Sequence, residues 1–211
     1  MRHRQIRDMV FASIMMALIV FLSVTMLGYI FYAQGTAPIT IIHIPVVVGA
    51  IVLGKRYGAL LGATFGLFSM IMAFIYPTYL FIINAPFTNP ILSVLPRAIF
   101  GFIIYPIYLL IDKYIKNRTA STALSIAIST LIHSIIVIIL LYFTIKTNLY
   151  FYADDYKAAF ESETLKSILM ILISFNSLIE IVIAVLVGTP AALILINLRN
   201  KYNEESNNQP L

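Results

Sequence analysis

Six apolar segments, separated by short polar stretches, cover most of this 211-residue sequence. A helix needs roughly 20 apolar residues to cross the hydrocarbon core of a bilayer. Only 11% of the residues are charged, whereas a soluble domain carries about a quarter. The sequence therefore predicts an all-α membrane protein with six transmembrane helices, for which lipid takes the place of water as the solvent.

We predict a single six-helix transmembrane domain over residues 1–200 and a polar C-terminal tail over residues 201–211. The predicted spans are residues 9–32, 39–54, 57–75, 90–111, 120–145 and 167–198. Pro45 interrupts the short second span, so a kinked or partly buried helix is expected there. Asp8 precedes the first span and can cap its N-terminus. Because that span lacks a small-residue cleavage site, we expect no cleaved signal peptide.

The basic residues sort to one side of this six-span arrangement. They precede the first span, follow the sixth, or lie in the turns after the second and fourth spans: Arg2, Arg4, Arg7, Lys55, Arg56, Lys113, Lys116, Arg118, Arg199 and Lys201. Such an excess marks cytoplasmic loops, so both termini are predicted to be cytoplasmic, in the inner or plasma membrane of a prokaryote. The net charge of +5 is then a topology signal, and no nucleic-acid partner is expected.

Small residues recur at helical spacing in two of the spans. Glycines lie at intervals of four: Gly54, Gly58, Gly62 and Gly66. On a helix this stripe lets another backbone approach closely, and we predict that it packs inside the bundle. Ser13 and Ala17 form a shorter pair next to Ala12. Its spacing favours internal packing and leaves a docking face for another membrane protein as the alternative.

Arg97 lies inside the fourth span, with no acidic residue within ten positions on either side. Its guanidinium stays protonated at any useful pH, so it must meet a carboxylate, a phosphate or several carbonyls. Two interpretations are open. Arg97 forms a structural ion pair with Glu180 of the sixth span, or it binds an anionic ligand with bidentate geometry.

Other polar side chains are expected near the same outer end. Asn176 and Glu180 are four residues apart and share one face of the sixth span, and His133 lies in the outer half of the fifth. A small wet pocket walled by spans four to six would collect them. The candidate ligand-binding residues are Arg97, His133, Asn176, Glu180, Asn89, Asn84 and Gln34. A packing role stays open for His133, and a capping or loop-anchoring role is expected for His43.

Several kinds of chemistry lack their motifs in this sequence. It contains no cysteine, no Gly-rich nucleotide-binding loop and no intramembrane protease motif. We therefore predict no catalytic residue, no metal site and no cofactor. A pocket without its own energy source indicates a binding subunit that is driven by other proteins. The alternative is a stand-alone transporter or a membrane enzyme using Glu180, His133 and Arg97, although no internal repeat of the transporter kind is evident.

The sequence resembles the S-components, the substrate-binding subunits of energy-coupling factor (ECF) vitamin transporters, over nearly its whole length. The resemblance lies in residues 12–17, 43–62, 89–97 and 176–180. It implies a six-helix bundle that docks on a transmembrane coupling subunit, which is powered by two cytoplasmic ATPases. Ser13 and Ala17, beside Ala12, would take the place of the family's Ala-x-x-x-Ala docking motif, and the whole subunit would topple in the bilayer to release its vitamin.

Within this family the sequence is most similar to the pantothenate-type members, through residues 43–62 and the Pro96-Arg97 pair. Pantothenate is a monoanion with hydroxyl groups and an amide. Arg97 would hold its carboxylate, while His133, Asn176 and Asn89 would serve the polar remainder. An S-component for pyridoxine, hydroxymethylpyrimidine or riboflavin is the alternative.

Overall fold

The computed structural model describes residues 2–25, 27–30, 39–75, 85–151, 154 and 175–208. Most of these residues are helical. The principal helices are α1 (Arg2–Val24), α2 (His43–Leu53), α3 (Lys55–Ile75), α6 (Leu95–Tyr114), α7 (Arg118–Lys146) and α10 (Thr189–Asn208). Two short elements, η1 (Ala85–Thr88) and α5 (Pro90–Ser93), lead into α6, and the π-helical segment η2 (Ala184–Gly188) leads into α10.

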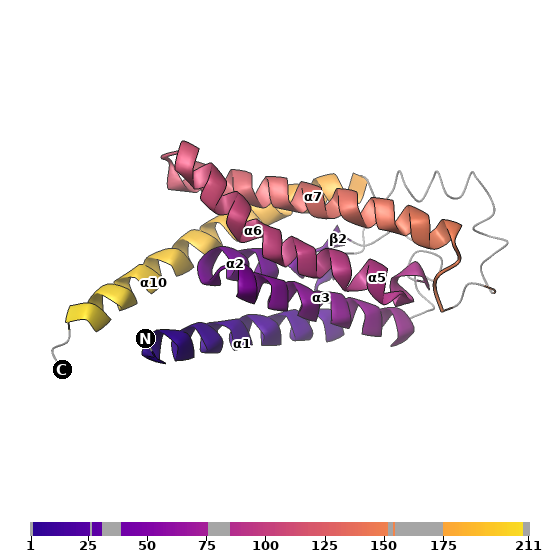
Figure 1. Ribbon diagram of the computed structural model, residues 1–211, viewed down its shortest axis with the longest axis horizontal. Helices are drawn as coiled ribbons and strands as arrows, with labels where there is room; N and C mark the ends of the chain where they lie inside the picture. The colour runs from indigo at the N-terminus through magenta and orange to yellow at the C-terminus, as the bar shows by residue number, and fades with distance from the viewer. Residues whose placement is uncertain are drawn as a thin grey trace.

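Among the described residues, five helices are long and apolar enough to cross a membrane: Gln5–Val24, Lys55–Ile75, Pro90–Tyr114, Arg118–Lys146 and Phe175–Tyr202. α2 is a sixth, shorter apolar helix that is buried along most of its length. The start of α1 and the end of α10 lie at the same end of the bundle (Figure 1). The predicted all-helical membrane fold is confirmed.

A two-stranded hairpin separates the first two helices. α1 ends at Val24, and β1 (Tyr29–Ile30) then pairs antiparallel with β2 (Ile39–Thr40). The first and second predicted spans had included these strand residues. Pro45 lies in the first turn of α2, where its missing N–H leaves no helical hydrogen bond unmade. Strand β2 therefore takes up the start of the second apolar segment, and α2 continues through Pro45 without a break.

Asp8 does not cap α1, because the helix begins at Arg2 and places Asp8 in its second turn. The Asp8 carboxylate instead forms ion pairs with Arg199 at 3.0 Å and with Arg7 at 3.3 Å. Arg199 also donates to the carbonyl oxygen of Val52 at the end of α2. These contacts tie the last helix to the first two.

α3 packs against α6 along its glycine stripe. A Cβ atom at Gly58 or Gly62 would overlap the α6 backbone at Gly101 or Arg97, and one at Gly66 would overlap the backbone of Ser93 at the end of α5. The prediction of internal packing is confirmed for these three glycines. Gly54 differs, since its φ of 96° ends α2 in a conformation that side chains disfavour. The close approach of α3 fixes the α6 backbone at Arg97.

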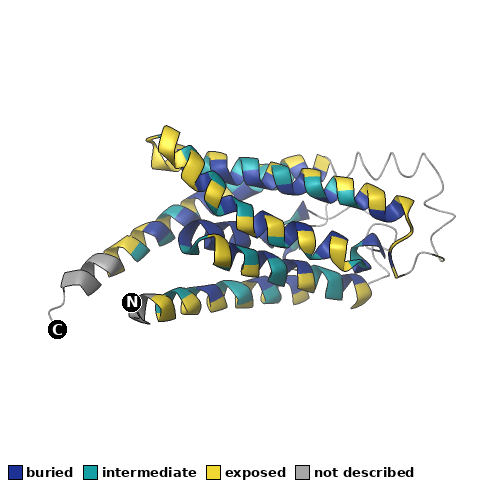
Figure 2. Cartoon of the chain, in the orientation of Figure 1, coloured by how far each residue is buried: buried dark blue, intermediate teal, exposed yellow. Residues whose placement is uncertain are grey.

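The outer surface of the bundle is apolar. In Figure 2 the buried positions lie along the inward sides of the helices, and the exposed positions follow their outward sides. The outward positions include large apolar side chains such as Leu67 of α3 and Leu131 and Ile139 of α7. Water would penalise so much exposed apolar area, whereas the acyl chains of a bilayer accept it.

Candidate functional site

Arg97 lies at the centre of the candidate site. Its side chain is 7% exposed, and Nη1 donates to the carbonyl oxygen of Leu92 at 2.6 Å. The guanidinium lies 4.9 Å from the ring centroid of Phe87 and 5.5 Å from that of Phe65, at cation–π distance. Nε is buried without a hydrogen-bond partner among the described residues. Two rings and one carbonyl hold the guanidinium in place without neutralising its charge.

Glu180 is bonded to the hairpin and not to Arg97. Thr40 donates its backbone N–H, at 2.7 Å, and its hydroxyl to the same carboxylate oxygen, Oε1. Arg97 and Glu180 are within electrostatic range of each other. However, the ion pairs between described side chains are those of Asp8 with Arg7 and Arg199. The structural Arg97–Glu180 ion pair, one of the two interpretations of the sequence, is therefore not formed.

Two histidines pack against Phe100. The ring of His133 is 4.7 Å from that of Phe100 in a tilted arrangement, and the ring of His43 meets it edge-on at 6.5 Å. Both histidines are buried, and Nδ1 of His133 and Nε2 of His43 have no hydrogen-bond partner among the described residues. His133 is in electrostatic range of Arg97 and His43, and His43 of Glu180. We call Arg97, Glu180, His43 and His133 the polar cluster.

The remaining predicted site residues have different positions. Asn176 is buried one helical turn before Glu180. Asn89 caps α5, since its Oδ1 accepts from the N–H of Ile91 at 2.8 Å and its Nδ2 donates to the carbonyl of Leu149. Both polar ends of Asn89 thus bind backbone, a capping role that the sequence prediction did not include. Asn84 and Gln34 lie outside the described residues.

His43 is the residue that sequence reasoning missed. Its neighbours Phe100 and Glu180 belong to helices far away in the chain, so no local pattern could have indicated the contact. The π-helical segment η2 follows Glu180 by one turn, and Pro190 in the sequence could have predicted this irregularity. Pro190 has no N–H and its ring displaces the carbonyl one turn earlier, which disturbs regular helical bonding in that region. Such π segments occur frequently at functional sites.

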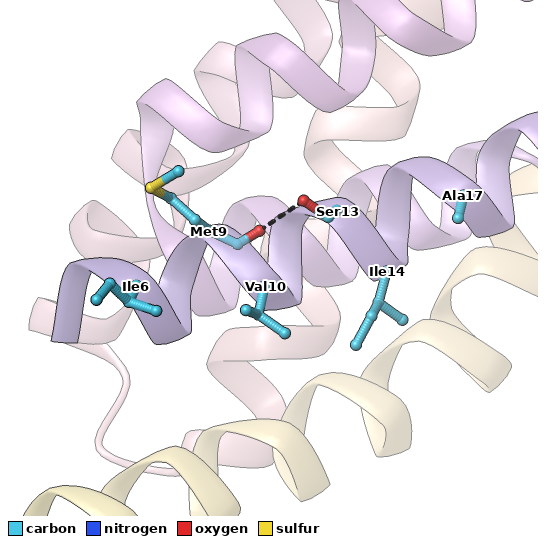
Figure 3. A pocket seen from close by; sticks show the side chains of 6 residues that line it. All are labelled: Ile6, Met9, Val10, Ser13, Ile14 and Ala17. Atoms are coloured by element: carbon cyan, nitrogen blue, oxygen red, sulfur yellow. Dashed lines mark hydrogen bonds between the residues drawn. The ribbon is translucent and has the colours of Figure 1, made fainter. Parts of the chain in front are cut away.

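A second candidate site is an apolar groove on α1. It has a volume of about 440 Å³ and is lined by Ile6, Met9, Val10, Ser13, Ile14 and Ala17 (Figure 3). Figure 3 shows the Ser13 hydroxyl bonded back to the carbonyl of Met9, at 2.9 Å. Ser13 therefore presents little unsatisfied polarity to the groove.

Exposure tests one of the two interpretations of the small residues of α1, that of internal packing. Ser13 and Ala17 are exposed, whereas Ala12 is 1% exposed and faces the bundle interior. Internal packing is therefore wrong for the pair and correct for Ala12, which was predicted as part of the same docking surface.

Comparisons with known proteins agree with this architecture. Residues 5–192 match the family described as the ECF transporter, substrate-specific component. The pantothenic acid transporter PanT of Lactococcus lactis subsp. cremoris is 28% identical over 172 residues, which is 76% of this chain and 79% of that protein. The pantothenate transporter PanT of Leuconostoc mesenteroides is 27% identical over 208 residues, 93% and 95% of the two chains. The chain therefore belongs to the family of ECF transporter substrate-specific components, which are parts of transporters and not enzymes.

Proposed function

We propose that this chain is the pantothenate-binding subunit of an ATP-driven ECF importer. One observation carries the proposal: Arg97 is a buried guanidinium that no carboxylate of the described residues neutralises. An uncompensated buried charge is costly, and a carboxylate ligand would compensate it through charge-assisted hydrogen bonds. Pantothenate carries one carboxylate, and both relatives are named for its transport.

The surroundings of Arg97 fit the rest of this ligand. The two histidines and Asn176 are buried polar groups of the kind that bind hydroxyl and amide groups. Thiamin is a cation and would be repelled by Arg97. Pyridoxine, hydroxymethylpyrimidine and riboflavin bring no carboxylate to it. The polar cluster therefore favours an anionic vitamin over the other ligands of this transporter class.

The orientation in the membrane follows from charge. One end of the bundle holds the start of α1 and the end of α10 (Figure 1). The basic residues Arg7, Arg199 and Lys201 lie in the parts of these helices toward that end. Because basic residues are retained on the cytoplasmic side, we place this end in the cytoplasm of a prokaryotic cell, with the chain in the plasma membrane. The hairpin and the polar cluster are then reached from the outside.

The groove on α1 is the proposed docking face for the transmembrane coupling subunit, which would connect this chain to two cytoplasmic ATPases. Small residues such as Ser13 and Ala17 let a second helix approach closely in lipid. The groove is open, apolar and free of unsatisfied charge. These properties match a helix-packing surface better than a ligand site.

The substrate is tested by calorimetric titration of the detergent-purified chain. We expect pantothenate to bind and pantothenol, the neutral alcohol of the same shape, to bind at least about 30-fold more weakly, because it cannot pair with Arg97. Pyridoxine, thiamin and riboflavin serve as comparison ligands. Binding of one of these in preference to pantothenate, by folded protein, would contradict the proposed substrate.

The docking face is tested by vitamin uptake in cells that supply a complete ECF module. Ala17→Trp fills the groove, so uptake should stop while the purified variant binds its ligand normally. Ile139→Trp places the same ring on the exposed side of α7, 49% exposed in the structure, and should leave both unchanged. Normal uptake by Ala17→Trp would remove α1 as the docking helix.

A further inference from the structure

We propose that His43 is a second ligand-binding residue of this site, and that its Nε2 accepts a hydrogen bond from a hydroxyl group of the substrate. The proposal rests on the pantothenate-binding function proposed above and assigns the residue that recognises the end of the ligand remote from the carboxylate. His43 had been expected only to cap α2 or anchor a loop.

Burial is the first argument. The His43 side chain is 3% exposed, yet Nε2 has no hydrogen-bond partner among the described residues. Buried polar atoms in folded proteins nearly always have a partner, and each exception calls for an explanation. A ligand that brings its own donor would supply the missing bond.

The chemistry of the ring decides what kind of group is missing. The imidazole of His43 lies beside the backbone carbonyls of Thr40 and Glu180. Carbonyl oxygens only accept hydrogen bonds, and Nε2 has no partner among the described residues, so Nδ1 is the nitrogen that can donate to them and carries the hydrogen. In a neutral imidazole the other nitrogen then has a lone pair. Nε2 is therefore an acceptor, and its partner must be a donor such as a hydroxyl group.

The position of His43 relative to Arg97 fits an elongated ligand. Phe100 lies one helical turn after Arg97 on α6, so both side chains project from the same face. The rings of His43 and His133 both contact the Phe100 ring, at 6.5 Å and 4.7 Å between centroids. A ligand held by its carboxylate at Arg97 and lying along this face would bring its far end to the two imidazoles.

The test combines two variants with two modified ligands in calorimetric titrations. His43→Phe keeps the ring and its contact with Phe100 but removes the acceptor, and pantothenate binding should weaken about tenfold. His43→Gln restores an acceptor and should recover most of the affinity. The two analogues of pantothenate that each lack one hydroxyl group identify its partner. For one of the two analogues, the affinity of the wild-type protein should be about tenfold lower than for pantothenate. The His43→Phe variant should bind that same analogue as tightly as the wild-type protein does.

Controls separate this proposal from the function on which it rests. Thr122→Val removes another buried hydroxyl that lacks a partner among the described residues, outside the polar cluster, and should leave the affinity unchanged.

If wild type binds pantothenate and His43→Phe binds it equally well, the role of His43 is overturned and the pantothenate site stands. Uniform weakening of pantothenate and both analogues by His43→Phe also overturns the hydrogen bond. If folded wild type does not bind pantothenate, both proposals are overturned. If His43→Phe does not fold, the hydrogen bond is tested by titrations of His43→Gln and of the wild-type protein. Equal affinity of the wild-type protein for pantothenate and for both analogues would exclude the bond.

Discussion

Two arginines reach into the bundle from different helices, and only Arg199 is neutralised by a carboxylate of the described residues. Arg199 of α10 forms an ion pair with Asp8 at 3.0 Å and donates to the carbonyl of Val52. Arg97 of α6 has a carbonyl and two aromatic rings as neighbours but forms no ion pair with a described carboxylate. The Arg199 side chain is partly exposed, at 32%, whereas Arg97 is buried.

The difference separates structural from functional charge. A buried or partly buried ion pair that closes on itself joins elements of the fold, as Arg199 joins α10 to α1 and α2. A buried charge without an opposite charge carries an energetic cost in the ligand-free state. Binding of an anion removes that cost, which is why such a residue indicates a ligand site.

Exchange of the two arginines for alanine should give the largest contrast. Arg97→Ala should weaken pantothenate binding by about 2 to 5 kcal/mol, which is roughly 30-fold to several thousand-fold, because the ligand carboxylate loses its partner. Ligand-free stability should not fall, since the variant removes an unpaired charge. Arg199→Ala should show the reverse, with a lower thermal unfolding midpoint and unchanged affinity. Equal effects of the two variants on affinity would abolish the distinction.

The bond between Thr40 and Glu180 should rank second. Thr40→Val removes one hydroxyl bond to a carboxylate and should lower the free energy of unfolding by about 1.5 to 3 kcal/mol. Thr64→Val is the matched control, because the Thr64 hydroxyl bonds only to the carbonyl of Leu60 in its own helix. Thermal and detergent-induced unfolding measure both. A Thr40 variant as stable as the control would show that the Thr40 hydroxyl adds nothing to the bond between the hairpin and Glu180.

The glycine contact behind Arg97 should have a slightly smaller effect. Gly62→Ala places a methyl group against the Arg97 backbone and should destabilise the protein by about 1 to 3 kcal/mol while also weakening ligand binding. At Gly188 the nearest atom to an added Cβ is a side-chain carbon of Ile126 at 3.4 Å. Gly188→Ala should therefore be nearly neutral. The same unfolding and titration measurements apply, and a silent Gly62→Ala would mean that α3 does not position Arg97.

The smallest effect is expected for the ion pair between Asp8 and Arg199 itself. Asp8→Asn should cost no more than about 1 kcal/mol, because the pair with Arg199 is partly exposed. A double-mutant cycle with Arg199→Gln measures the coupling between the two side chains. Coupling near zero would leave the Val52 carbonyl as the main contact of Arg199, and ligand affinity should not change in any of these variants.

Much of the candidate site could be read from the sequence, and the reasons for the gaps are physical. Arg97 stood out because a charge inside an apolar span is costly wherever the chain places it. Asn89 looked like a ligand contact because an amide in an outer segment can bind either a ligand or a helix end. Only the structure shows that its side chain accepts from the Ile91 N–H and caps α5. Ala12 and Ser13 are adjacent small residues, but one faces inward and the other outward.

The sequence by itself determined the membrane class, the helical architecture and the choice of Arg97 as the first candidate site residue, because hydrophobic length and the cost of a buried charge are properties of segments and single residues. Tertiary structure alone decided that Glu180 binds Thr40 instead of Arg97, that Asp8 binds Arg199, and that His43 packs against Phe100. Each of these contacts connects residues distant in the chain. Their formation depends on how the helices pack in space, through contacts such as those of Gly58 and Gly62 with α6.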